Sequence, residues 1–157
     1  MEIKRYLLTR SDNTRRMEKM DRIEYIVITS SKYKGFSSLK NRNVIEKIKY
    51  KQDKELSCHY IIDTNGVVLN IIPDKESAIC THNVDIDSKS ISIMLTVNDE
   101  GNYNEVELKA LKNLLNKLVK KYRIKNENIL REYDVNLSRR PTVFVDEPIL
   151  LYELVNS

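Results

Sequence analysis

The sequence is poor in cysteine and contains no long apolar run. Its 157 residues include only two cysteines, Cys58 and Cys80, too few for the disulfide framework of a small secreted protein. We therefore expect a reducing, cytosolic setting. No run of about 18 apolar residues is present, which excludes a membrane-spanning helix of ordinary length. The apolar stretch near the N-terminus is also too short for a secretory signal, so we expect a cytoplasmic protein. If it meets the cell wall, it leaves the cell by lysis or by a holin-like route.

Proline, repeats and linker-like segments are scarce as well. The chain has three prolines and a hydrophobic fraction of 41%, which fits a folded protein rather than a disordered one. Its length suits one domain with a single sizeable core. We expect one domain over residues 1–157, with residues 1–22 as an N-terminal extension that packs on it.

Positive charge is concentrated in one segment. The net charge is +4, and residues 32–54 contain only Glu46 and Asp53 as acidic residues. The basic residues of this segment are Lys32, Lys34, Lys40, Arg42, Lys47, Lys49, Lys51 and Lys54. Such a surface can attract nucleic acid, anionic wall polymers or an acidic protein. We interpret it as a solvated helix face, and we do not expect a nucleic-acid partner.

Several short segments rich in apolar and β-branched residues predict strands. They are residues 23–28, 58–63, 67–72 and 90–95. The second and third flank Asn65-Gly66, and this dipeptide is typical of a two-residue hairpin turn in which both residues have positive φ. Residues 58–72 therefore predict a β-hairpin.

Helical spacing of apolar residues is strongest over residues 105–122. Asn104 can cap this helix, and Glu107 occupies the capping-box position. The apolar stripe consists of Leu108, Leu111, Leu115, Leu118 and Tyr122. Weaker spacing predicts a surface helix over 37–52 and a last helix from about Asp146. Strands interspersed with helices indicate a single α/β domain with a mixed sheet flanked by helices.

Four segments carry a resemblance to a known family. They are the strand Tyr25-Ile26-Val27-Ile28 and the segments 57–63, 129–135 and 139–145. In this order and at this spacing they resemble the zinc-dependent N-acetylmuramoyl-L-alanine amidases. This family includes the amidase-type phage lysozymes and the peptidoglycan-recognition proteins, and the resemblance is greatest to clostridial and clostridial-phage lysins. It covers essentially the whole chain and implies the same fold.

The resemblance also implies where a zinc site would lie. The family holds zinc with two histidines and a cysteine, and the matching positions here are Thr29, Glu132 and Arg140. A neutral hydroxyl is a poor zinc ligand, and a guanidinium stays protonated and repels a dication. Catalytic zinc needs three protein ligands and an open position for water. We therefore expect zinc to be lost and no other cofactor to replace it.

Other family positions point the same way. The family's glutamate that activates the zinc-bound water corresponds to Met94, which cannot transfer a proton. A cleft histidine corresponds to Cys80, and a lysine that stabilises developing charge in some members corresponds to Ser138. The resemblance thus implies a pseudoenzyme in which the catalytic positions have changed.

Two alternatives concern the metal site. The similarity could be due to chance, or the site could have moved to Cys58, Cys80 and His82. Cys58 and His59 are neighbours on a predicted strand, so their side chains point to opposite faces and cannot both bind one ion. Taken singly, Cys58 fits a core or cleft-wall position, His59 a hydrogen-bonded structural histidine and His82 an exposed loop. An active amidase with a relocated site is therefore the least expected outcome.

The former ligand positions also suggest a new contact and a function. We hypothesise that Glu132 pairs with Arg140 and replaces part of the zinc cross-link. The candidate cleft residues are Cys58, Cys80, His82, Ser138 and Arg140. The first functional hypothesis is a catalytically inactive protein that binds peptidoglycan or muropeptide fragments, with Arg140 on a peptide carboxylate. The second is a protein-interaction module, a phage or bacterial regulator or inhibitor with a protein partner.

Overall fold

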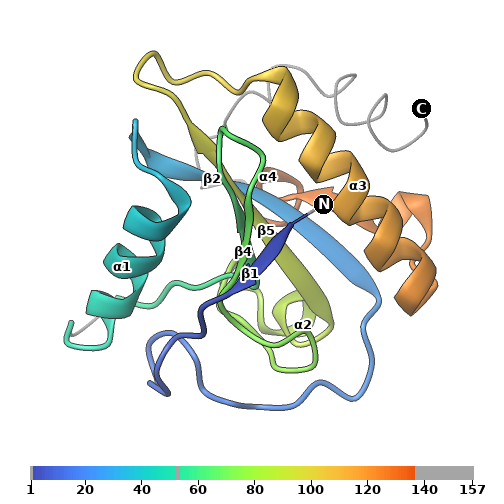
Figure 1. Cartoon of the computed structure of the whole chain (residues 1–157). Coiled ribbons are helices and arrows are strands. Elements are labelled where there is room, and N and C mark those ends of the chain that lie inside the picture. Colours follow the sequence, from blue (N-terminus) through green and yellow to red (C-terminus); the bar gives the residue numbers. More distant parts are fainter. Residues whose placement is uncertain (1, 52–53, 137–157) are drawn as a thin grey trace.

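The fold is built on one six-stranded mixed sheet, and the computed structural model describes residues 2–51 and 54–136. The strand order is β1-β4-β3-β5-β2-β6 (Figure 1). The strands are β1 (Ile3–Arg5), β2 (Tyr25–Lys34), β3 (Tyr60–Ile62), β4 (Val68–Asn70), β5 (Ser90–Val97) and β6 (Ile129–Arg131). Neighbouring strands are parallel except for the antiparallel pair β3 and β4. The predicted α/β fold with a mixed sheet is confirmed.

Helices lie on both sides of this sheet. They are α1 (Ser38–Ile48), α2 (Val84–Asp87), α3 (Glu105–Tyr122) and α4 (Glu132–Val135), with a 3-10 turn η1 at Asn126–Asn128. Figure 1 shows α3 on the right of the sheet and α1 on the left. In the part of the chain that is described, no helix is long and apolar enough to cross a membrane.

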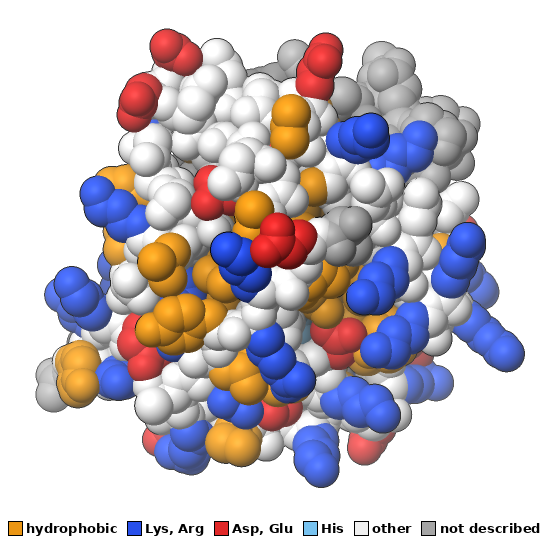
Figure 2. Space-filling model, in the orientation of Figure 1, with side chains coloured by type: hydrophobic (Ala, Val, Ile, Leu, Met, Phe, Trp, Pro, Cys, Tyr) orange, Lys and Arg blue, Asp and Glu red, His pale blue; other side chains and the backbone are white. Residues whose placement is uncertain are grey.

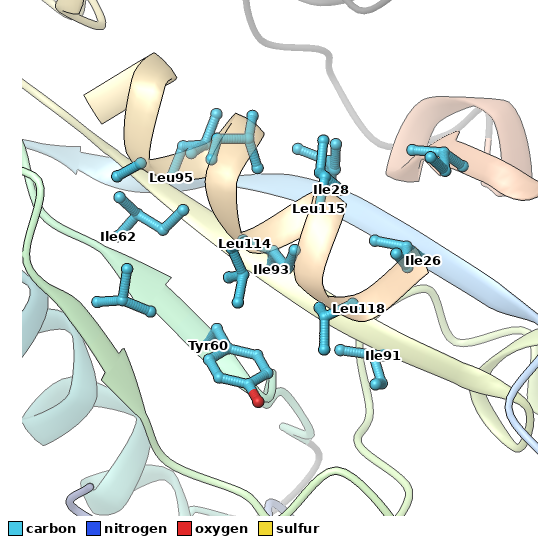
Figure 3. Close-up of a cluster of buried hydrophobic side chains, with 14 of the residues drawn as sticks. Ile26, Ile28, Tyr60, Ile62, Ile91, Ile93, Leu95, Leu114, Leu115 and Leu118 are labelled. Carbon is cyan, nitrogen blue, oxygen red and sulfur yellow. The ribbon is translucent and has the colours of Figure 1, made fainter. Parts of the chain in front are cut away.

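The larger core lies between α3 and the sheet. Alternate residues of the central strands point to this side and meet the leucines of α3 (Figure 3). The labelled side chains are Ile26, Ile28, Tyr60, Ile62, Ile91, Ile93, Leu95, Leu114, Leu115 and Leu118. The predicted apolar stripe of 105–122 therefore forms the packing face of α3, and the predicted bounds of that helix are confirmed.

A second buried cluster occupies the other side of the sheet, between the sheet and α1. Its members are Leu8, Ile45, Cys58, Ile61, Leu69, Ile71, Ile72, Ala78 and Met94. The sheet is thus covered by apolar contacts on both faces, as expected for mainly parallel strands. The cluster includes Leu8 from the segment before β2, so the first part of the chain contributes to the core.

Cations of the basic segment hold the N-terminal part of the chain against α1. The Arg42 guanidinium lies 3.9 Å from the centre of the Tyr6 ring and donates to the carbonyl of Leu7 at 2.6 Å. Lys49 Nζ donates to Thr9 Oγ1 at 3.0 Å. Because Arg42 is buried, the interpretation of residues 32–54 as a solvated face is wrong for this residue.

Several element bounds differ from the sequence predictions. β2 continues to Lys34, because its end still pairs with β5 through Lys34 and Val97. α1 ends at Ile48 rather than at residue 52. The helix expected from about Asp146 lies outside the described residues.

The hairpin of β3 and β4 is confirmed, but its turn differs from the prediction. The Gly66 N–H donates to the carbonyl of Asp63 at 2.8 Å, and Gly66 has a φ of 86°. Among the described non-glycine residues, positive φ occurs at Met17, His82 and Arg123 and not at Asn65. The Asn65 side chain instead accepts a hydrogen bond from the Val67 N–H at 3.0 Å. Only the glycine therefore needs left-handed backbone.

Glu107 does not complete a capping box. Asn104 caps α3 through the Glu107 N–H at 2.8 Å, as predicted. The Glu107 side chain instead turns into the core, where Thr96 Oγ1 of β5 donates to it at 3.2 Å. The side chain is fully buried, and burial raises the pKa of Glu107 to about 8. The Glu107 carboxyl therefore links α3 to the sheet. Its raised pKa means that the folded protein favours the protonated carboxyl.

This burial predicts a pH dependence of stability. The folded-state pKa of Glu107 exceeds its ordinary value of 4.5, so folding favours the protonated carboxyl, and the free energy of unfolding should fall as pH rises from 4.5 to about 8. Glu107→Gln should remove most of this fall, measured by urea unfolding at several pH values. Glu105→Gln, at an exposed position in the same helical turn, is the matched control. An unchanged pH profile in Glu107→Gln would contradict the assignment.

Candidate functional site

Two of the residues singled out by the sequence lie side by side on the central strands. Thr29 of β2 is in register with Met94 of β5, and Met94 is in register with Ile61 of β3. Residues paired in this way point to the same face of a sheet. Because Ile61 and Met94 belong to the cluster between the sheet and α1, Thr29 also faces the α1 side. Both Thr29 and Met94 are buried.

Glu132 reaches Thr29 from the end of β6. This strand pairs with β2, with Arg131 opposite Ile28, so the first residue of α4 follows next to Thr29. The Thr29 hydroxyl donates a hydrogen bond to Glu132 Oε2. The structure therefore brings together two positions that are 103 residues apart. Arg140 and Ser138 lie outside the described residues, and the Glu132–Arg140 pair stays a prediction.

These residues do not fit a zinc site. Thr29 offers a neutral hydroxyl whose proton is committed to Glu132, and Met94 offers a buried thioether, whereas zinc in proteins takes imidazole, thiolate or carboxylate ligands. Among residues 2–51 and 54–136, no three or more His, Cys, Asp or Glu side chains gather as a metal site would require. Within the described ranges, Glu132 is thus a carboxylate without the further ligands that catalytic zinc needs.

Cys58 lies in the cluster between the sheet and α1 and is fully buried. Burial raises the pKa of its thiol, and the nearby Glu132 carboxylate raises it further. A thiol is nucleophilic only as the thiolate. Cys58 is therefore an unreactive, buried thiol. This agrees with the core position that the sequence suggested for it.

The loop with Cys80 and His82 is organised by Asp87. The Asp87 carboxylate accepts backbone N–H groups of Cys80, Thr81 and His82 at 3.3, 3.0 and 3.1 Å. Burial raises the pKa of Asp87, while the hydrogen bonds of this loop oppose the shift. His82 is exposed with a φ of 64°, and Cys80 is buried. Asn136 Nδ2, just after α4, donates to the carbonyl of Thr81 at 2.9 Å, so this loop and α4 border the same region.

His59 has a structural role, because both of its ring nitrogens are hydrogen-bonded. Its Nε2 lies 2.6 Å from the carbonyl of Glu76, so that nitrogen carries the proton. Its Nδ1 accepts the Ser92 N–H at 3.0 Å. Burial lowers the pKa of His59, which keeps the ring neutral. With both nitrogens occupied, His59 cannot join a relocated metal site.

Three features of the site escaped the sequence analysis. They are the Thr29–Glu132 hydrogen bond, the Asp87 carboxylate and the Asn136 contact. Asp87 ends the short helix α2, which also contains Asp85, so nothing in the neighbouring sequence distinguishes it. Knowledge that β2 pairs with β6 would have indicated that Thr29 meets Glu132. The sequence does not supply it, because short apolar segments do not fix the order of strands in a sheet.

The Thr29–Glu132 contact can be tested by a double-mutant cycle. Thr29→Val should lower the free energy of unfolding by about 1–3 kcal/mol, because it removes a hydrogen bond to the half-buried Glu132 carboxylate. Adding Glu132→Gln should then cost less than it does in the wild type, since the contact is already lost. Urea unfolding of the four proteins measures the coupling. Additive effects within about 0.5 kcal/mol would show that the two side chains do not interact.

Solved structures share this fold at low sequence identity. The catalytic domain of XlyA superposes with a TM-score of 0.83 at 15% identity, over 99% of this chain and 100% of that chain. A mutant endolysin from Bacillus subtilis gives 0.81 at 15% identity, over 99% and 100%. The N-acetylmuramoyl-L-alanine amidase LysC from Clostridium intestinale gives 0.72 at 16% identity, over 98% and 97%. The Clostridium protein is no more similar than the others, so a clostridial type stays a prediction.

Sequence comparison identifies the family. No curated protein matches the chain. The family Amidase_2, described as N-acetylmuramoyl-L-alanine amidase, matches residues 19–142 and therefore spans most of the sequence. The matched range includes β2, the hairpin, β5, α3 and β6, which together position Thr29, Met94 and Glu132. The chain belongs to the N-acetylmuramoyl-L-alanine amidase family.

Proposed function

We propose that this protein is a catalytically inactive member of the amidase family that acts by binding peptidoglycan or muropeptide fragments. The observation that carries the proposal is the hydrogen bond from Thr29 to Glu132. Two positions at which the family resemblance implies zinc ligands are here joined directly to one another. Thr29 offers only a neutral hydroxyl, and Glu132 offers one carboxylate, whereas catalytic zinc takes three imidazole, thiolate or carboxylate ligands.

The remaining groups near Thr29 support the loss of catalysis. Met94 stands where the resemblance implies a proton-transferring glutamate, and a thioether does not exchange protons. The raised pKa of the Cys58 thiol disfavours a thiolate nucleophile, and His59 is neutral with both nitrogens bonded. Within the described residues around this site, we therefore assign no general base and no activated nucleophile.

Binding is supported by what the family fold retains. The loop with Cys80 and His82 is held in a defined conformation by Asp87, and Asn136 joins that loop to the segment after α4. A preorganised wall loses little entropy when a ligand binds. Ligand recognition in such sites comes from a few polar groups among apolar walls. In our proposal Arg140 supplies one of them, as a bidentate partner for a carboxylate of the stem peptide.

The proposal predicts that binding depends on Arg140 and not on its neighbour. Purified sacculi, stripped of their phosphodiester polymers, should sediment the wild-type protein. Arg140→Ala should weaken this binding by about tenfold, the effect expected for losing one charge-assisted hydrogen bond of roughly 1.5 kcal/mol. Arg139→Ala makes the same change in net charge and should bind as the wild type does.

Two results would contradict this function. Failure of the wild-type protein to bind stripped sacculi would show that peptidoglycan is not its ligand. Release of new amino termini from sacculi during incubation would show amidase activity, and the protein would not be catalytically inactive. Recovery of one stoichiometric protein partner, together with no binding to sacculi, would instead favour the protein-interaction module.

A further inference from the structure

The side of α3 that faces away from the sheet is strongly basic. Exposed Lys and Arg side chains follow one another along this helix and the segment after it: Lys109, Lys117, Lys120, Lys121, Arg123 and Lys125. Figure 2 shows Lys and Arg side chains gathered on the right of the molecule, the side on which α3 lies in Figure 1. We name these residues the α3 basic surface. Exposed acidic residues stand only toward its ends, at Glu105 and Glu127.

The cations of this surface form a row rather than a single pocket. Lys109 and Lys120 are eleven residues apart, close to three helical turns, so they lie on one line about 16 Å long. Lys117 lies between them along the helix axis but about 80° around the helix from Lys109. The buried Leu111 and Leu118 lie on the sheet side. A row of separated cations suits a polymer with repeated negative charges better than one small anion.

Contacts within the protein use little of this charge. Lys121 Nζ lies 3.9 Å from Asp74 Oδ2 and remains largely exposed. Asp74 already accepts the hydroxyls of Tyr60 at 2.5 Å and Tyr122 at 2.6 Å. No other ion pair within 4.0 Å joins the α3 basic surface to residues 2–51 or 54–136. Most of the positive charge therefore faces solvent.

Helix stability explains only part of the surface. Cations in the last turn interact favourably with the helix dipole, which accounts for Lys120, Lys121 and Arg123. The effect falls off within that turn, so it does not account for Lys109 or Lys117. Lys125 lies beyond the helix. These positions leave a charged row that the fold itself does not need.

The α3 basic surface lies across the sheet from the candidate site. α3 packs on one face through Leu114, Leu115 and Leu118, whereas Thr29 and Met94 point to the opposite face. A polymer bound along α3 would therefore leave the candidate site accessible. One protein molecule could then contact the wall through two separate surfaces.

We propose that the α3 basic surface binds a linear phosphodiester-linked polymer of the cell wall, of the poly(glycerol phosphate) type. The inference rests on the proposed function, which places the protein at the wall. Single-stranded nucleic acid carries similar charge, but its tight binding also uses aromatic side chains for base stacking. The exposed tyrosines Tyr6, Tyr33 and Tyr50 lie outside α3. Among the residues that the structure describes, α3 therefore offers no exposed aromatic ring for base stacking.

The test is direct binding of labelled poly(glycerol phosphate) to the full chain at low ionic strength. The triple variant Lys109→Gln, Lys117→Gln and Lys120→Gln should bind about tenfold more weakly or worse, since each exposed ion pair contributes up to about one kcal/mol. The control variant Lys32→Gln, Lys34→Gln and Lys47→Gln loses the same net charge from exposed positions elsewhere. It should bind within about twofold of the wild type, and added salt should weaken binding by all three proteins.

Three results would overturn the inference. Equal loss of affinity in both triple variants would show an effect of net charge alone, and unchanged affinity in the α3 variant would exclude this surface. Tighter binding to a single-stranded oligonucleotide than to the wall polymer would assign the surface to nucleic acid. Stripped sacculi separate the two proposals: the α3 variant should still bind them, and a wild type that binds only the polymer would disprove the proposed function alone.

Discussion

The pairing of β2 with both β5 and β6 is the constraint on which the described site depends. β5 places Met94 beside Thr29, and β6 delivers Glu132 to the same point. These neighbours come from segments far apart in the chain, so the sheet order alone determines that they meet. The two clusters on the faces of the sheet hold this order, because a slip of one residue would exchange the buried side chains of the two faces.

The energetic role of the site is small beside that of the two cores. One hydrogen bond to a carboxylate contributes about 1.5–3 kcal/mol. The Thr29–Glu132 bond alone therefore does not hold the fold together. The fold must therefore rest on the α3-side cluster and the α1-side cluster, in which most of the central strands are fully buried. In our proposal, stability without a metal comes from the two cores rather than from the site.

Much of this architecture could be predicted from the sequence, for identifiable physical reasons. The bounds of α3 were predictable because the leucine stripe and the Asn104 cap act locally, and the hairpin was predictable from Asn65-Gly66. The side-chain direction of Glu107 was not, because a capping box and a buried bond to Thr96 begin from the same sequence position. The family resemblance located Thr29 and Glu132, but their direct bond depends on strand order, which short apolar segments do not encode. The basic row on α3 was overlooked because its lysines interleave with the stripe and do not form a run.

We propose that this member of the amidase family has exchanged a metal site for a direct contact between side chains. The zinc content per chain, measured by elemental analysis of protein purified under zinc-replete conditions, tests this directly. We expect less than about a tenth of an equivalent, since the positions that should supply three ligands offer a hydroxyl, one carboxylate and a guanidinium. Close to one equivalent of zinc would contradict it and would place the metal on residues other than Thr29 and Arg140.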